Sequence, residues 1–353
     1  MGVVNSLNRN ERLFLYGLAR HPGLTDREIG GEMGLSRSTT TSIRNRLERL
    51  GCFSYVRVPD FGRLGCELFN VHYSHLNPLA DHDAWWKGFQ ETRYFNNMFF
   101  YAGSSHDDVI MTVTRNYTEE KRGLDEILRL NELSGTLYDE HPCNIFFPLS
   151  LSKIFLFLDF SDLIGDYYRL GREREEKIEF KVPSRKPLNL TSKEKEVLYY
   201  LVKYPEDRDE DIAEKAGCSR QTVNKTKTSF EKEGLLTTRI IPNLRSLGFE
   251  LLTFTHTTYN PATPIETRAE GITRIVRDSS QFMIISTDTE SVRLSAFRDY
   301  HELQKKYTSF IKHYMKKKYI LHNPTIKVHS ISDPRFKVYM NFHKPLKSML
   351  ELR

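Results

Sequence analysis

Polar side chains that can read nucleic-acid bases occur twice in the chain, each time at the start of an expected helix. Ser36-Arg37-Ser38-Thr39 recurs as Ser219-Arg220-Gln221-Thr222, 183 positions later (219 minus 36). A serine at such a position can accept a hydrogen bond from a free backbone N–H of the helix. Arg, Gln and Asn side chains pair with base edges in the major groove. The two segments therefore predict two recognition helices, the first over about 37–50.

The outward-facing polar and basic residues of these segments form the predicted DNA-binding set. Apolar residues at helical spacing, such as Ile43 and Leu47, turn one side of the first helix inward. Basic residues near the helix ends and on the strands that follow are placed to approach phosphates. The set consists of Arg37, Ser38, Thr41, Ser42, Arg44, Asn45 and Arg57 in the first segment, and of Arg220, Gln221, Asn224, Lys225, Lys227, Thr228 and Arg239 in the second.

No catalytic or metal-binding pattern accompanies this set. The sequence contains no Gly-rich phosphate loop, no nucleophile elbow and no Cys-x-x-Cys pair. His106-Asp107-Asp108 could chelate a metal, but a polar loop is the better interpretation. We therefore predict no catalytic residue, no metal, no cofactor and no enzymatic activity.

Each recognition helix is expected as the third helix of a winged helix-turn-helix. Thr25-Asp26-Arg27-Glu28 is a capping box that starts a short second helix. Gly34 then supplies the backbone freedom for the tight turn before Ser36, and Gly217 does the same before Ser219. The strands that follow, at 53–58 and 236–241, are expected to form the wings.

The similarity between the two segments extends far beyond these helices at a constant offset. Leu15-Tyr16 matches Leu198-Tyr199, and Leu64-Gly65 matches Leu247-Gly248. A match at one fixed offset over such a length predicts two homologous halves. The expected boundaries are a winged helix-turn-helix at 1–60, an α/β domain at 61–165, a charged and Pro-rich linker at 166–189, a second winged helix-turn-helix at 190–243 and a second α/β domain at 244–353.

The second module of each half has the element order βαββαβ, which is a ferredoxin-like unit. A further strand with alternating polarity follows in each half, at 153–160 and at 335–342. We therefore predict an α+β fold of two repeats, each a winged helix-turn-helix followed by a ferredoxin-like βαββαβ domain with one extra strand. The other expected strands are 68–73, 98–102, 109–114 and 137–147, then 251–255, 282–286, 292–297 and 321–331; the expected helices are 81–96, 118–133, 265–278 and 301–318.

This order of elements, together with Arg57-Val-Pro-Asp-Phe-Gly-Arg-Leu-Gly65, resembles the leucine-responsive regulator (Lrp/AsnC) family of bacteria and archaea, and an archaeal source is expected. The resemblance implies a transcription regulator whose α/β domain dimerises and binds an amino acid or another small molecule. It also implies an effector loop with a glycine and an aspartate. The first half provides Gly103, Asp107 and Asp108 there, whereas the matching stretch of the second half, 286–290, lacks the glycine.

The function that follows is sequence-specific regulation of transcription by a covalent pseudo-dimer with two non-identical reading helices. Double-stranded DNA is the expected partner, and two unequal helices favour an asymmetric target site. A small-molecule effector and self-association through the α/β domains are further expectations from the resemblance.

Composition sets broader bounds on the class of protein. Hydrophobic residues make up 39% and charged residues 28% of the chain, which is typical of a globular protein rather than a disordered one. The net charge of +6 is compatible with a nucleic-acid partner. No apolar run is long enough for a transmembrane helix, and the start of the sequence lacks a signal-peptide core. We therefore expect a cytoplasmic protein without a membrane partner.

Two alternatives remain open at this point. Siroheme decarboxylases are similar in fold to this family, also occur as fused pairs and use His and Arg near a tetrapyrrole, and the chain has many histidines, His72 and His256 among them. The aromatic segment associated with those enzymes is absent where 104–109 stand, so the regulator is the preferred interpretation. The other alternative is a scaffold whose winged helices bind a protein.

Overall fold

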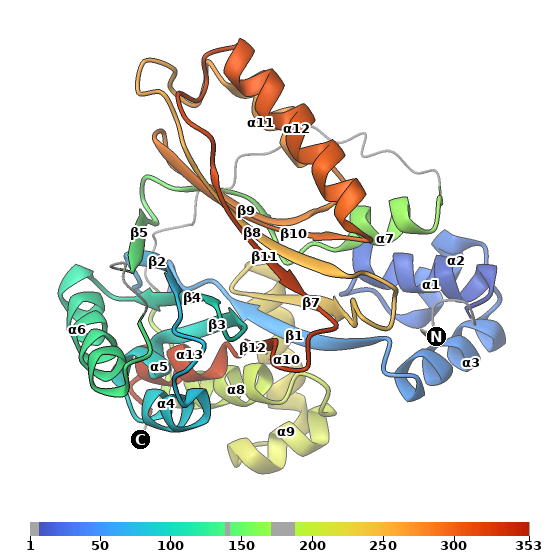
Figure 1. The fold of residues 1–353 in the computed structure, drawn as a ribbon. Helices are drawn as coiled ribbons and strands as arrows, with labels where there is room; N and C mark the ends of the chain where they lie inside the picture. Colours follow the sequence, from blue (N-terminus) through green and yellow to red (C-terminus); the bar gives the residue numbers. More distant parts are fainter. Residues whose placement is uncertain (1–6, 138–141, 171–187, 353) are drawn as a thin grey trace. The chain divides into compact units, whose positions relative to one another are not determined.

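The computed structural model describes residues 7–137, 142–170 and 188–352. The chain divides into two compact units, each built from segments far apart in the sequence (Figure 1). Unit 1 contains Met1–Val56, Lys153–Lys181 and Thr238–Ser332. Unit 2 contains Arg57–Ser152, Val182–Thr237 and Asp333–Arg353. Two strands carry these crossings, β1 (Phe53–Pro59) and β7 (Leu236–Pro242), and they form a two-stranded sheet.

Unit 1 begins with the three expected short helices, α1 (Arg9–Arg20), α2 (Asp26–Met33) and α3 (Arg37–Arg49). The capping box forms as expected, because Thr25 and Glu28 each accept a hydrogen bond from the backbone N–H of the other. Gly34 then adopts a φ of 71°, which favours glycine, and Ser36 caps α3 by accepting from the N–H of Thr39.

The sheet of unit 1 has five strands in the order β11-β8-β10-β9-β6. All of its neighbouring strands are antiparallel. Two helices, α11 (Ala269–Val276) and α12 (Tyr300–Lys316), pack on one face and bury an apolar cluster that includes Ile284, Phe310 and Tyr314 (Figure 1). The strands are β6 (Lys153–Phe157), β8 (Leu251–Thr258), β9 (Gln281–Ser286), β10 (Glu290–Phe297) and β11 (Thr325–Ser330).

Unit 2 holds the second set of short helices and the other five-stranded sheet. The helices are α8 (Ser192–Lys203), α9 (Asp209–Ala216) and α10 (Arg220–Lys232), and Ser219 caps α10 as expected. The sheet order is β12-β3-β4-β2-β5. Its strands are β2 (Leu68–His75), β3 (Met98–Gly103), β4 (Asp107–Thr114), β5 (Cys143–Pro148) and β12 (Lys337–Met340).

Helices α4 (His82–Gln90), α5 (Arg93–Asn97) and α6 (Tyr117–Ser134) cover one face of the unit 2 sheet. An aromatic-rich core that includes Trp85, Phe89 and Tyr94 lies beneath them. The single helix expected over 81–96 is interrupted, because Thr92 starts α5 as a new N-cap. The indole N–H of the buried Trp85 donates to Asn131 of α6 at 2.6 Å and ties α4 to that helix.

The extra strand of each half requires a correction. The sequence predicted that 153–160 and 335–342 each extend the sheet of their own half. Instead, β6 pairs with β9 in unit 1 and β12 pairs with β3 in unit 2, so each strand joins a sheet whose other strands come from a distant part of the sequence. The strands lead into α7 (Ser161–Tyr167), which packs on α1, and α13 (His343–Leu350), which packs on α8.

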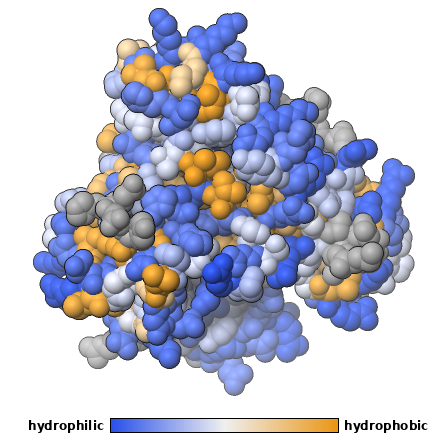
Figure 2. Space-filling view, in the orientation of Figure 1, coloured by the Kyte–Doolittle hydropathy of each residue, from blue (hydrophilic) through white to orange (hydrophobic). Residues whose placement is uncertain are grey.

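The face drawn in Figure 2 is largely hydrophilic, with apolar residues showing in separate groups. Exposed apolar side chains include Leu79 and Leu133 in unit 2 and Leu321 in unit 1. In the part of the chain that the structure describes, no helix has the length and apolar character needed to cross a membrane. Within the same residues no cluster of three or more His, Cys, Asp or Glu side chains could hold a metal ion.

Candidate functional site

Polar side chains line the helix-covered face of the unit 1 sheet, where an apolar surface would be usual. Thr255 pairs with Arg293 and Thr253 pairs with Ser295 across β8 and β10. Alternate residues of a strand share a face, so these four side chains point toward α12. All four are buried. Buried polar groups of this kind need partners, which makes the region a candidate site.

A hollow lies between these strands and α12. It encloses about 310 Å³ of space, part of it open to solvent. The part of it that a water-sized molecule can reach is about 20 Å³, far below the roughly 300–1,000 Å³ of ligand pockets. Its lining residues are Thr253, Thr255, Asp278, Gln281, Arg293, Ser295, Phe297, Leu303, Lys306, Tyr307, Phe310 and Ile326.

Arg293 is the decisive residue of the hollow. Its side chain is 5% exposed, and its guanidinium lies 4.1 Å from the centre of the Phe310 ring. Among the residues that the structure describes, its Nε has no hydrogen-bond partner and no carboxylate pairs with it. A buried charge without a counter-ion is strongly unfavourable, so such a group is expected to receive an anion.

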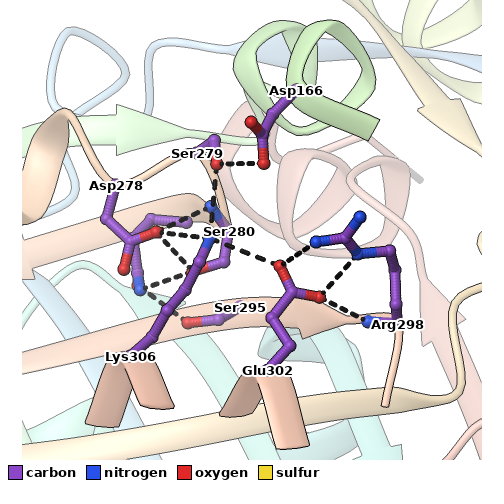
Figure 3. A network of polar contacts seen from close by, with 9 residues as sticks. Asp166, Asp278, Ser279, Ser280, Ser295, Arg298, Glu302 and Lys306 are labelled. Carbon is purple, nitrogen blue, oxygen red and sulfur yellow. Dashed lines mark hydrogen bonds and ion pairs between the residues drawn. The ribbon is translucent and has the colours of Figure 1, made fainter. Parts of the chain in front are cut away.

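The other cation of the hollow is already paired (Figure 3). Lys306 Nζ lies 2.9 Å from Asp278 and 3.5 Å from Glu302. Burial alone would raise the pKa of Asp278, but attraction to Lys306 and hydrogen bonds from Ser280 outweigh it and lower the pKa below its ordinary value. Asp278 is therefore the partner of Lys306. The hollow as a whole keeps one positive charge, that of Arg293.

The corresponding face of the unit 2 sheet carries a buried carboxylate instead of a buried cation. Glu120 of α6 is 0% exposed and accepts hydrogen bonds from Asn70 Nδ2 at 2.8 Å and from Thr112 Oγ1 at 3.0 Å. Burial raises its pKa to about 7, and the hydrogen bonds only partly oppose the shift. The hydroxyl of Tyr94 accepts a hydrogen bond from the same Asn70 amide. Glu120 therefore supplies a carboxyl group to the polar layer of unit 2 from within the chain, while Asn70 Oδ1 and His72 Nε2 have no hydrogen-bond partner among the described residues.

The residues expected to form an effector loop belong to this same unit. Gly103 ends β3, and Asp107 begins β4 and pairs with His75 at 2.7 Å. Asp108 is buried and accepts a hydrogen bond from Ser74 Oγ at 2.5 Å; burial raises its pKa, opposed by attraction to His72. Both carboxylates are engaged within the fold, and we make no proposal for an effector there.

The outward side of α3 presents most of the first predicted DNA-binding segment. Arg37, Ser38, Thr41, Ser42 and Asn45 are all exposed there, and Thr40, Ile43 and Leu47 face the interior. The geometry therefore leaves a polar helix face with one arginine at its N-terminal end.

Two of the predicted phosphate contacts need revision. Arg57 is 7% exposed and donates a hydrogen bond to the carbonyl of Leu201 at 3.3 Å, so it cannot reach a phosphate and is withdrawn from the predicted set. The neighbouring residues of its unit enclose it, which a lone strand pattern did not indicate. Arg44 is half-buried and pairs with Asp26 and with the hydroxyl of Tyr55. Its guanidinium is therefore committed to the packing of α3.

The second recognition helix differs from the first in its acidic surroundings. Arg220 lies 3.1 Å from Glu210, and both Asn224 and Lys227 contact Asp209. Gln221, Lys225 and Thr228 are exposed, and Arg239 on β7 is half-buried. Acidic groups beside a basic face weaken the attraction to phosphate on which DNA affinity depends.

No protein-family model matches the chain, and no curated protein matches it by sequence. Among solved structures, the siroheme decarboxylase NirDL is similar over 97% of this chain and 98% of its own, with a TM-score of 0.51 and 10% identity. NirDL in complex with an iron-uroporphyrin III analogue is similar over 92% of each chain, with a TM-score of 0.50 and 9% identity. AsnC of E. coli covers 42% of this chain and 95% of its own, with a TM-score of 0.32 and 12% identity.

These comparisons correct one expectation and establish the fold. The prediction that the chain is not an enzyme is contradicted, because the structures that match it nearly from end to end are those of an enzyme. At 10% identity the match to NirDL establishes a shared mixed α/β fold.

Sequence reasoning missed the residues of the hollow. Arg293 stands in an otherwise apolar and small-residue strand, Val292-Arg293-Leu294-Ser295-Ala296, where a charged side chain is unusual. That local irregularity was the available signal. The pairing of Lys306 with Asp278 had no such signal, because the two residues meet only through the packing of α12 on the sheet.

Proposed function

We propose that the chain is an enzyme acting on a carboxylate-rich tetrapyrrole of the siroheme class, with decarboxylation as the reaction. The observation that carries the proposal is Arg293, a buried cation without an acidic partner, in a hollow of a fold that NirDL shares along its whole length. Tetrapyrroles of this class bear several acidic arms, and a guanidinium is well suited to bind a carboxylate.

In this proposal a carboxylate of one substrate arm lies against Arg293, and the macrocycle stays outside the hollow, which is far too small for it. Decarboxylation breaks the bond between a methylene carbon and the carboxyl carbon, releases CO₂ and leaves an electron pair on the methylene, which takes up a proton. A cation on the reacting carboxylate would stabilise the charged ground state and oppose this step. Arg293 is therefore assigned to a carboxylate that anchors the substrate and does not react.

The test is titration of the purified chain with siroheme, followed by visible absorption and then by mass spectrometry of the extracted pigment. Binding should perturb the Soret band at stoichiometric protein, and turnover should yield products lacking CO₂. Arg293→Gln should weaken binding, and Glu132→Gln, an exposed change on α6 in the other unit, should not. A spectrum of siroheme unchanged by the wild-type chain would refute the proposal.

We also propose that α3 contacts double-stranded DNA, a second function that the exposed polar face of Arg37, Ser38, Thr41, Ser42 and Asn45 favours. Gel-shift experiments on genomic fragments at several salt concentrations test it. Arg37→Ala should weaken specific binding by about 1–3 kcal/mol. The matched change Arg220→Ala should have a smaller effect, because Glu210 already offsets that charge. Equal losses for both variants, or no binding by the wild type, would contradict the assignment.

A further part of the proposal concerns the domain organisation of the chain. We propose that the chain is a tandem duplication in which each copy is a winged helix-turn-helix followed by a ferredoxin-like domain, with the domain limits expected from the sequence. The order of elements from α1 to α7 and from α8 to α13 supports it. Two copies in one chain meet at high effective concentration, so association within the chain replaces dimerisation.

A further inference from the structure

The hollow of unit 1 and the buried carboxylate of unit 2 lie beside equivalent residue pairs in their two sheets. Thr253 pairs with Ser295 across β8 and β10, as Asn70 pairs with Thr112 across β2 and β4. The sequence offset that relates the halves, 183, links Thr253 to Asn70, Ser295 to Thr112 and also Leu303 to Glu120.

The helix that covers each sheet starts in the same way, which supports the match between Leu303 and Glu120. Asn116 caps α6 and Asp299 caps α12, and each accepts from the backbone N–H of a glutamate three residues on. Glu120 directly follows that glutamate in α6, and Leu303 directly follows it in α12. Both side chains are buried, and Leu303 lines the hollow.

The Glu120 position of unit 2 and the Leu303 position of unit 1 differ in the charged group that lies there or nearby. In unit 2 the carboxylate of Glu120 is held by Asn70 and Thr112, and no cation is found beside it among the described residues. In unit 1 the carboxylate is replaced by an apolar leucine and the hollow, and Arg293 supplies a cation. Two buried polar atoms there, Thr253 Oγ1 and Arg293 Nε, have no hydrogen-bond partner within the described chain.

We propose that the hollow of unit 1 is a carboxylate-binding site, in which a ligand carboxylate lies against Arg293 and Thr253 where Glu120 places the chain's own carboxylate in unit 2. In unit 2 the Glu120 side chain takes the place that the ligand carboxylate takes in unit 1. Only unit 1 therefore has a carboxylate-binding site. The inference rests on the proposed function only for the identity of the larger ligand. The chemical class, a carboxylate, follows from the buried and unpaired guanidinium of Arg293.

Binding of a short carboxylate tests the site directly. Propionate labelled with ¹³C at its carboxyl carbon is titrated against the full chain and observed by NMR line broadening, with propionamide as the neutral control. Propionate should bind and propionamide should not, and Arg293→Gln should weaken propionate binding at least about tenfold. Glu120→Gln should leave binding unchanged, because Glu120 lies in unit 2 and does not line the hollow. Equal binding of propionate to wild type and Arg293→Gln would overturn the proposal, and so would equal binding of propionate and propionamide.

A second measurement needs no ligand and covers the case in which Arg293→Gln fails to fold. Leu303→Glu places a carboxylate in the hollow as Glu120 does in unit 2, and Leu303→Gln is its neutral match. With Arg293 present, Leu303→Glu should melt at a higher temperature than Leu303→Gln, and Leu303→Glu should abolish propionate binding. Arg293→Met should remove or reverse the difference in melting temperature. A Leu303→Glu variant that melts below Leu303→Gln would overturn the proposal.

The failure of this inference and that of the proposed function can be told apart. If propionate binds through Arg293 but siroheme and an iron-uroporphyrin leave the wild-type spectrum unchanged, the carboxylate site stands and the tetrapyrrole function is refuted. If siroheme binds equally well to wild type and Arg293→Gln, and propionate does not bind, the carboxylate site is refuted and the tetrapyrrole must bind elsewhere.

Discussion

Replacing Glu120 with glutamine should remove a large pH dependence from the stability of the protein. The carboxyl group is fully buried among neutral partners, and its pKa rises from 4.5 to about 7. Because the folded state holds the proton more tightly than the unfolded state, the stabilisation is complete below pH 4.5 and is lost as the pH rises through about 7. Each pKa unit corresponds to about 1.4 kcal/mol, so the loss amounts to about 3 kcal/mol.

The assay is urea unfolding followed by circular dichroism at several pH values between 5 and 8, with the free energy of unfolding extrapolated to water. Between pH 5 and 8 the wild type should lose most of this amount relative to Glu120→Gln, whose amide keeps the size of the side chain and never ionises. Glu132→Gln on the exposed side of the same helix is the control and should follow the wild type. Parallel pH profiles for wild type and Glu120→Gln would refute the raised pKa of the Glu120 carboxyl group.

Three further substitutions probe the packing around both polar layers. Arg268→Met should lower the free energy of unfolding by about 2–4 kcal/mol, measured by urea unfolding. The guanidinium is fully buried and donates to backbone carbonyls, which would lose their partner. A loss under 1 kcal/mol would contradict this role. Lys306→Met should reverse the pH dependence contributed by Asp278. The wild type gains this stability as the pH rises toward 3.8 and keeps it at higher pH, whereas the variant, with the carboxyl buried beside no lysine, should lose stability as the pH rises above 3.8; an unchanged profile would contradict the pairing. Gly103→Ala should lower the melting temperature, since its Cβ would collide with the hydroxyl of Tyr101, and an unchanged melting temperature would show that the ring can move away.

Local features of the fold were predictable from the sequence because they depend on neighbouring residues. The capping box of Thr25 and Glu28, the turn at Gly34 and the cap at Ser36 each act within a few positions of the chain. The strand positions were predictable for the same reason, since alternation and β-branched residues mark a strand wherever it pairs. The polar face of α3 also followed from helical spacing alone.

The candidate site depends on contacts that the sequence pattern does not encode. The alternating pattern of a strand such as β6 does not indicate which strand it pairs with. In the structure β6 pairs with β9, which lies far away in the sequence. The environment of an arginine is equally non-local: Arg57 was expected on a wing and is buried, whereas Arg293, an unusual charge within an apolar strand, is the unpaired cation of the hollow. The sequence by itself determined the capped helices α2, α3 and α10, the turn at Gly34 and the strands of the two five-stranded sheets. Only the tertiary structure decided which side chains lose water and which buried charge lacks a partner, because desolvation depends on the whole surrounding shell.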